Sequence, residues 1–241
     1  MPDGQPPKVK GVVDIVFLMD ATGSMAPCID ALKKNVEMFI DSLTVSSGNN
    51  VSPVRDWRAK VVGFRDFEVD AEPWIDNDFV RDVAQLKAQL GGLEARGGGD
   101  EPESLLDALY RVASVGQTDK GAQAEDPQKW RYRSSAARVA IVFTDAPFKE
   151  KMAIPEAKGG GIDDVVNAVT SNRVIVSLFA PEMPCFDRIS EIDRAEYMAI
   201  PDAGKGPQQA LVAFTADQAN FQETLKQLAA SVSKSAETPA L

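Results

Sequence analysis

Short stretches that are almost continuously apolar and rich in β-branched residues recur along the chain. They are too short for typical helices and are typical of strands that are buried on both faces of a sheet. We expect strands at residues 12–19, 57–67, 138–144, 174–179 and 211–214, with a short edge strand at 72–75.

Between these strands, apolar residues recur every three or four positions, which predicts amphipathic helices. The first helix is marked by Ile29, Leu32, Val36, Phe39, Ile40 and Leu43, and others are expected at residues 80–90, 105–112, 163–172, 188–197 and 218–231. Alternating strands and helices indicate an α/β fold with a doubly wound, mostly parallel central sheet flanked by helices.

Three segments lack this patterning. Residues 116–137 are polar and without periodicity, so we expect a surface insertion there. Within it, Trp130, Arg131, Tyr132 and Arg133 are expected in a solvated approach to the next strand or, as the alternative, in a surface that binds a partner. Residues 1–11 are expected to be a flexible N-terminal segment and residues 232–241 a frayed tail, which leaves one domain at 12–231.

Composition and charge narrow the classes of function. With 44% hydrophobic and 26% charged residues, the chain of 241 residues has the composition of a globular domain. Its net charge of −10 disfavours nucleic acid and anionic membranes as partners and suits cations. Without a signal-peptide pattern or an apolar run of about 18 residues, we expect a soluble cytoplasmic protein.

The cysteines and the missing histidines exclude further chemistry. Cys28 and Cys185 are far apart in the sequence, which fits free thiols in a reducing compartment better than a disulfide framework or a zinc site. The chain has no histidine, so it lacks the most common general base and any imidazole ligand. This weighs against most hydrolase mechanisms.

Polar residues gather where the predicted strands end. The motifs are DATGSM at 20–25, GGGDEPES at 97–104 and TDAPF at 144–148. The carboxyl ends of parallel strands are the usual ligand-binding edge of such a sheet. The motifs supply hard oxygen donors, which favour Mg²⁺, Mn²⁺ or Ca²⁺ over zinc or copper. The candidate ligands are the carboxylates Asp20, Asp100 and Asp145 and the hydroxyls of Thr22 and Ser24.

Each of these residues also has a purely structural interpretation. Thr22 and Ser24 are good helix caps and Asp20 is a good turn former. Asp100 and Glu103 have the spacing of a capping box. We assign Asp66 and Glu103 to the shell that supports the site, with an ion pair between Arg65 and Asp66 as a further expectation.

The segment DIVFLMDATGSM resembles the first strand and metal loop of the von Willebrand factor A (VWA) family, with its D-x-[ST]-x-S signature. The resemblance covers roughly residues 12–231. GGGDEPE and TDAPF are similar to the versions found in bacterial VWA proteins and beside atypical alpha-kinases. The resemblance implies a metal-ion-dependent adhesion site (MIDAS) with Asp20, Thr22, Ser24 and Asp145 as metal-binding residues. The family's remaining threonine has no match, and Asp100 is the nearest replacement.

The resemblance further implies a binding module and not an enzyme. It implies a protein partner whose Asp or Glu completes the coordination of a bound Mg²⁺. In bacterial relatives such partners include kinases, phosphatases and ATPases in signalling or stress response. Two alternatives stay open. One is a metal-dependent phosphohydrolase, although a haloacid-dehalogenase phosphatase needs an aspartate where Thr22 stands. The other is a scaffold with a degenerate, empty site.

Overall fold

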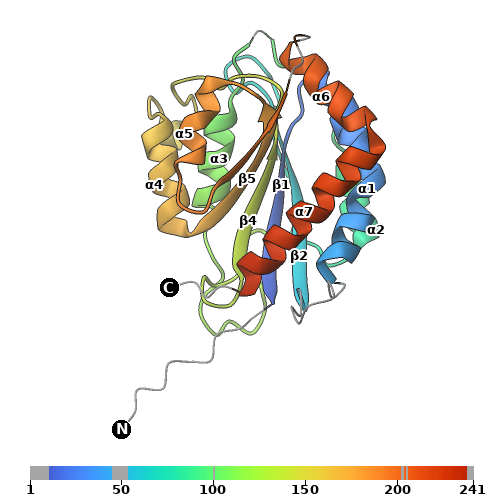
Figure 1. Cartoon of the computed structure of the whole chain (residues 1–241). Helices are drawn as coiled ribbons and strands as arrows, with labels where there is room; N and C mark the ends of the chain where they lie inside the picture. Colours follow the sequence, from blue (N-terminus) through green and yellow to red (C-terminus); the bar gives the residue numbers. More distant parts are fainter. Residues whose placement is uncertain (1–10, 45–53, 100, 202–203, 205, 238–241) are drawn as a thin grey trace.

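The fold is built around one sheet of six strands in the order β3-β2-β1-β4-β5-β6 (Figure 1). The structure is a computed structural model, and it describes all residues except 1–10, 45–53, 100, 202–203, 205 and 238–241. The strands are β1 (Val12–Asp20), β2 (Asp56–Phe64), β3 (Trp74–Asp76), β4 (Ala137–Phe143), β5 (Val174–Pro181) and β6 (Glu196–Ile200). All neighbouring strands are parallel except β2 and β3, which are antiparallel.

Helices cover both faces of the sheet, so the fold is the predicted doubly wound α/β arrangement. One face carries α1 (Ala26–Thr44), α2 (Val83–Gly91), α6 (Pro207–Ala216) and α7 (Gln218–Glu237) (Figure 1). The other carries α3 (Leu105–Ser114), α4 (Ile162–Asn172) and α5 (Asp187–Ser190). Short 3-10 turns lie at Gly23–Met25, Pro155–Ala157 and Pro184–Phe186. Within the described residues, no helix is long and apolar enough to cross a membrane.

The central strand β1 shows why the strands correspond to unbroken apolar runs in the sequence. Ile15, Phe17 and Met19 pack into the core beneath α1 and α7, whereas Val16 and Leu18 pack into the core beneath α3. All five side chains are buried because side chains of a strand alternate between two covered faces.

Two predicted elements near the C-terminus are wrong. Residues 211–214 lie inside helix α6 and form no strand. The helix predicted at 188–197 stops at Ser190, and residues 196–200 form the edge strand β6. There the hydroxyl of Tyr197 donates to Pro181 O at 2.6 Å and accepts from Met183 N at 3.1 Å, which fastens β6 beside β5.

The helix predicted at 80–90 begins three residues later, at Val83. Val80 instead forms an antiparallel bridge with Ala59 of β2. Asp82 is the N-cap of α2 and accepts a hydrogen bond from Gln85 N at 2.8 Å.

The segment 116–137 returns to the core after an exposed stretch at 119–125. Trp130 is 1% exposed, and its Nε1 donates to Val112 O in α3 at 3.0 Å. Arg131 is also buried, against Asp14 of β1. A solvated approach or a partner-binding surface is therefore wrong for Trp130 and Arg131, whose side chains are buried within the domain, whereas Tyr132 is half-buried and Arg133 is exposed.

Candidate metal centre

Parallel pairing of β1 with β4 places Asp20 beside the Thr144–Asp145 dipeptide. Met19 lies opposite Phe143 in this pairing, so both strands end at the same edge of the sheet. Asp20 is 0% exposed and Asp145 is 1% exposed. The strand ends therefore bring two buried carboxyl groups into one region, as the sequence predicts.

Hydroxyl groups connect these two carboxyl groups. Asp20 Oδ1 accepts from Thr22 N at 2.9 Å and from Thr22 Oγ1 at 2.7 Å. The Thr22 and Ser24 hydroxyl oxygens are 3.5 Å apart, and the Ser24 hydroxyl in turn interacts with Asp145. Thr22 occupies the cap position of the following 3-10 turn, but its side chain makes no capping bond. Its hydroxyl instead donates a hydrogen bond to Asp20.

Burial makes it unfavourable for these two carboxyl groups to be ionised. The pKa of Asp20 is raised to about 6, first by burial and then by the charge of Asp145. Burial also raises the pKa of Asp145. Asp145 Oδ1 is buried without a hydrogen-bond partner, and such an atom costs free energy unless a further group satisfies it.

Glu103 belongs to the same electrostatic neighbourhood. Its pKa is raised to about 8, first by burial and then by Asp20, Asp66, Asp70 and Asp145. Its Oε2 is buried and has no hydrogen-bond partner. Glu103 is held by backbone hydrogen bonds to the loop after β4, from Glu103 N to Pro147 O at 2.8 Å and from Lys149 N to Glu103 O at 2.9 Å.

The glycine motif closes over the metal loop. Gly97, Gly98 and Gly99 all have positive φ, and Gly98 N donates to Asp70 Oδ2 at 3.0 Å. A Cβ added to Gly98 would lie 2.6 Å from Thr22 Cγ2 and 2.8 Å from Glu103 Oε1. Only glycine allows the backbone to approach Thr22 this closely.

The capping box expected at 100–103 is wrong. Helix α3 begins at Leu105, with Ser104 in the cap position, and Glu103 pairs instead with Phe148 in a parallel bridge. The Ser104 hydroxyl is 3.3 Å from Asp66 Oδ1. Asp100 lies outside the described residues, so its place as a candidate ligand stays a prediction.

Arg65 and Asp66 do not form the expected ion pair with each other. Asp66 Oδ1 lies 2.6 Å from Lys149 Nζ. The Arg65 guanidinium donates to three backbone carbonyls, those of Ala21, Glu72 and Glu94, at 3.2, 2.7 and 2.7 Å. Arg65 thus helps to hold the metal loop, and Asp66 lies in the surrounding shell.

The donor set fits a hard divalent cation. Asp20, Thr22, Ser24 and Asp145 offer only oxygen atoms, and one buried oxygen of Asp145 is free. Across the described ranges, no group of three or more His, Cys, Asp or Glu side chains is arranged to hold a metal ion. A cation at this edge would therefore depend on the hydroxyls of Thr22 and Ser24 as well as on the two carboxylates.

Comparison with known proteins finds a family model that matches part of the chain. The family model of the von Willebrand factor A domain matches residues 14–119. A relative, the alpha-protein kinase vwkA of Dictyostelium discoideum, is 26% identical over 170 residues, which cover 67% of this chain and 24% of the kinase. The chain thus spans about a quarter of that relative.

Solved structures to which the chain is similar include two of the pilus adhesin SpaC from Lactobacillus rhamnosus GG, one of them in an open conformation. Both have a TM-score of 0.49 and 14% identity, over 92% of this chain and 31% or 32% of the adhesin. The match of the family model begins in β1 and includes the DATGSM loop, so this part of the chain is similar to a von Willebrand factor A domain.

Proposed function

We propose that the chain is a protein-binding module whose binding to its partner depends on a divalent cation. Asp20, Ser24 and Asp145, with Thr22, would hold Mg²⁺, or Mn²⁺ or Ca²⁺ in its place. The observation that carries the proposal is the buried pair Asp20 and Asp145, joined through two hydroxyls, with Asp145 Oδ1 unsatisfied. A cation would offset the repulsion between the two carboxylates and would give Asp145 Oδ1 a partner.

The partner would supply an Asp or Glu carboxylate. Two carboxylates and neutral hydroxyls leave a bound divalent cation with open coordination positions and a preference for anionic oxygen. Gly23 in the metal loop is exposed, so the loop that carries Thr22 and Ser24 reaches the protein surface. Glu103 lies nearby with its pKa raised to about 8, so its carboxyl group is mostly protonated at neutral pH, and a bound cation would favour its ionised form.

Binding suits this arrangement better than phosphoryl transfer. A nucleophilic aspartate must reach its substrate, whereas Asp20 is 0% exposed and accepts hydrogen bonds at both oxygens. Thr22 holds the position at which a phosphatase of the haloacid-dehalogenase kind would need a second aspartate. We therefore propose a role that is not enzymatic, in the cytoplasm, beside a signalling partner such as a kinase, phosphatase or ATPase.

Thermal melting with each divalent cation against a chelator tests the proposal. A ligand at a hundredfold excess over its dissociation constant adds about 2.7 kcal/mol, or roughly 5–11 °C for a chain of this size. Asp20→Ala and Asp145→Ala should abolish the shift, and Asp163→Ala, at an exposed ion pair with Arg188, should keep it.

Three results would contradict the proposal. A native chain indifferent to every cation favours the empty scaffold. A shift that survives Asp20→Ala places the ion elsewhere. Turnover of p-nitrophenyl phosphate that disappears in Asp20→Asn favours the phosphohydrolase.

A further inference from the structure

Arginines converge at the opposite edge of the sheet, where β4 and β5 begin. Arg138 is the second residue of β4, and Arg173 immediately precedes β5. The Arg138 guanidinium donates to Asn172 O at 3.0 Å, next to Arg173, and to Arg131 O at 2.9 Å. It also donates to Gln117 Oε1, which accepts from Arg133 N at 3.2 Å. Arg133, Arg138 and Arg173 thus form one group, the strand-start arginines.

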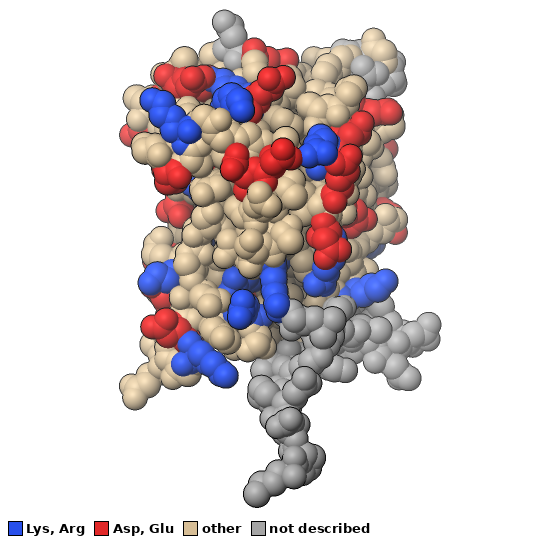
Figure 2. Space-filling model, turned by 90° about the vertical axis from the view of Figure 1, so that its left-hand side faces the viewer, with Lys and Arg blue, Asp and Glu red and all other residues tan. Residues whose placement is uncertain are grey.

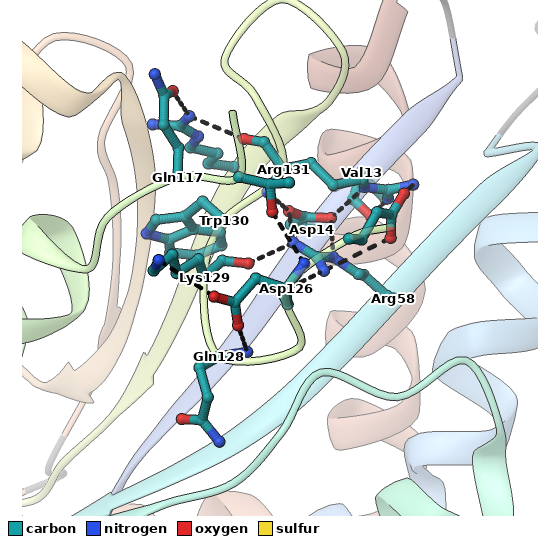
Figure 3. A network of polar contacts seen from close by, with 12 residues as sticks. Val13, Asp14, Arg58, Gln117, Asp126, Gln128, Lys129, Trp130 and Arg131 are labelled. Carbon is teal, nitrogen blue, oxygen red and sulfur yellow. Dashed lines mark hydrogen bonds and ion pairs between the residues drawn. The ribbon is translucent and has the colours of Figure 1, made fainter. Parts of the chain in front are cut away.

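Within the described residues this group has no ion-paired carboxylate, in contrast to the arginines beside it. Arg58 and Arg131 share the buried Asp14 (Figure 3), and Arg131 also pairs with Asp56. No ion pair links the strand-start arginines to a carboxylate in the described part of the chain. Burial is the largest cause that lowers the pKa of Arg138, to about 10; the charge of Asp14 raises this pKa, and the charges of Arg133, Arg173 and Arg58 lower it further.

One nitrogen of the group is unsatisfied. Arg138 is 4% exposed, and its buried Nε has no hydrogen-bond partner. Arg133 and Arg173 are exposed and frame the position of Arg138. On the side of the molecule drawn in Figure 2, basic side chains form a row across the lower part, at the end where the strands begin, and acidic side chains predominate above it.

A purely structural role explains only part of this arrangement. Cations near the C-terminus of α4 interact favourably with its free carbonyls, which accounts for Arg173 and for the bond from Arg138 to Asn172 O. This role does not account for Arg133, which lies in the segment before β4 and not at the C-terminus of α4. It also leaves a positive group uncompensated in a protein with a net charge of −10.

We propose that the strand-start arginines bind a phosphate group. Three guanidinium groups without carboxylate partners suit a dianion better than a single carboxylate, and the planar Arg fork matches phosphate oxygens in bidentate geometry. The exposed Arg133 and Arg173 contact the phosphate, and the buried Arg138 supplies a fixed positive charge beneath them. The phosphate is either free in solution or carried by a phosphorylated protein segment.

This site is independent of the proposed metal site. Arg138 is the second residue of β4 and Asp145 lies two residues past its end, so at about 3.3 Å per residue they are about 23 Å apart. Loss of metal binding therefore leaves phosphate binding intact, and the two proposals fail separately.

The test is an NMR titration of amide signals in the full chain at constant ionic strength. The probes are inorganic phosphate, a phosphoserine peptide, and the same peptide with Glu in place of phosphoserine. We expect saturable shifts of the signals of residues 117, 131–138 and 172–174. The double variant Arg133→Gln/Arg173→Asn should bind at least tenfold more weakly. Asn at 173 tolerates the left-handed backbone found there, where φ is 55°, so this variant removes charge with little strain.

Two controls accompany the double variant. Arg188→Gln removes an exposed arginine that pairs with Asp163 and Glu191, and it should bind phosphate like the native chain. Asp20→Ala should also bind phosphate normally. Tighter binding of the phosphopeptide than of inorganic phosphate assigns the phosphate to a protein segment, and equal binding assigns it to a free species.

Several outcomes overturn the proposal. One is the absence of saturable phosphate binding, and another is the same shifts with sodium chloride alone. A third is unchanged affinity in the double variant. Equal affinity for the Glu peptide and the phosphoserine peptide would show that the group recognises acidic segments in general and not phosphate.

Discussion

The hydroxyl of Thr144 donates a hydrogen bond of 2.8 Å to Asp20 Oδ2, across the ends of the two central strands. Both residues are 0% exposed. Since Thr22 donates to the other oxygen of Asp20, the carboxylate is fixed from both sides. These hydrogen bonds lower the pKa of Asp20 against the stronger effect of burial. Thr144 therefore orients a proposed metal ligand without being one.

Replacing Thr144 by Val should weaken metal binding by about 10–100-fold, the usual effect of losing a group that orients a metal ligand. Val fills the same volume but leaves Asp20 Oδ2 without its donor, so the pKa of Asp20 rises further above about 6. Titration calorimetry with Mg²⁺ or Mn²⁺ measures the change. Thr144→Ser keeps the hydroxyl and should bind almost normally. Equal affinities for the Thr144→Val variant and the native chain would show that this hydrogen bond does not matter.

The metal-free protein should become less stable as the pH rises from about 5 to 8. Glu103 has its pKa raised from 4.5 to about 8, so the folded state holds its proton more tightly than the unfolded chain does. The stabilisation is complete below the unfolded pKa and is lost as the pH rises through the folded pKa. Glu103→Gln, which cannot ionise, should flatten this dependence. Calorimetric melting in chelator at several pH values measures it.

A matched control for this pH dependence is Glu156→Gln, because Glu156 pairs with Arg111 and its pKa is lowered. That variant should keep the decline between pH 5 and 8. With saturating Mg²⁺ the trend should weaken or reverse, since the cation competes with protons for Asp20 and binds better at higher pH. An identical decline in Glu103→Gln and native chains would remove Glu103 as its source.

The sequence predicts the sheet and the meeting of Asp20 and Asp145 because both depend on local patterns. Apolar runs mark strands that are covered on both faces, and parallel strands end at one edge. Residues 211–214 show the limit of such patterns. Four apolar residues fit a buried helix as well as a strand, and only the surrounding helix α6 decides between them.

Contacts between distant segments explain the other differences. The spacing at 100–103 suggested a capping box, but Glu103 pairs with Phe148 in a parallel bridge. No local pattern in the sequence indicates this pairing. The burial of Arg131 does have a signal in the sequence. Asp14 is a lone carboxylate inside the apolar run of the first strand, and a buried charge requires a partner of opposite sign.

Gly98→Ala should abolish metal binding as well as lower stability. Position 98 has a φ of 99°, and an added Cβ would lie 2.6 Å from Thr22 Cγ2. The loop must move, and it must displace Thr22, whose hydroxyl holds Asp20. Gly121→Ala is a matched control, since its φ is 79° and its added Cβ meets nothing within 4 Å. Both variants should lose about 1–3 kcal/mol from backbone strain. If melting shows that both retain the response to Mg²⁺, the glycine loop does not hold the site.

Asp14 is the centre of a buried ionic network at the start of β1. Its oxygens accept from Arg58 Nε and Nη2 at 2.9 and 2.8 Å and from Arg131 N and Nε at 2.6 and 2.6 Å (Figure 3). Arg58 also donates to the carbonyls of Asp126 and Lys129 at 3.2 and 2.5 Å. The network thereby fastens the segment before β4 to the sheet.

Asp14→Ala should be among the most destabilising single substitutions in the described part of the chain, because it leaves Arg58 and Arg131 buried without their shared carboxylate. Breaking a buried pair from one side costs about 3–5 kcal/mol, which corresponds to a fall of roughly 6–20 °C in melting temperature. Asp163→Ala, which breaks an exposed pair with Arg188, should cost less than about 1 kcal/mol. Metal binding to folded Asp14→Ala should be unchanged, since Asp14 lies about 20 Å along β1 from Asp20. A melting temperature within about 2 °C of the native value would show that water replaces the lost carboxylate and that the network is not needed for stability.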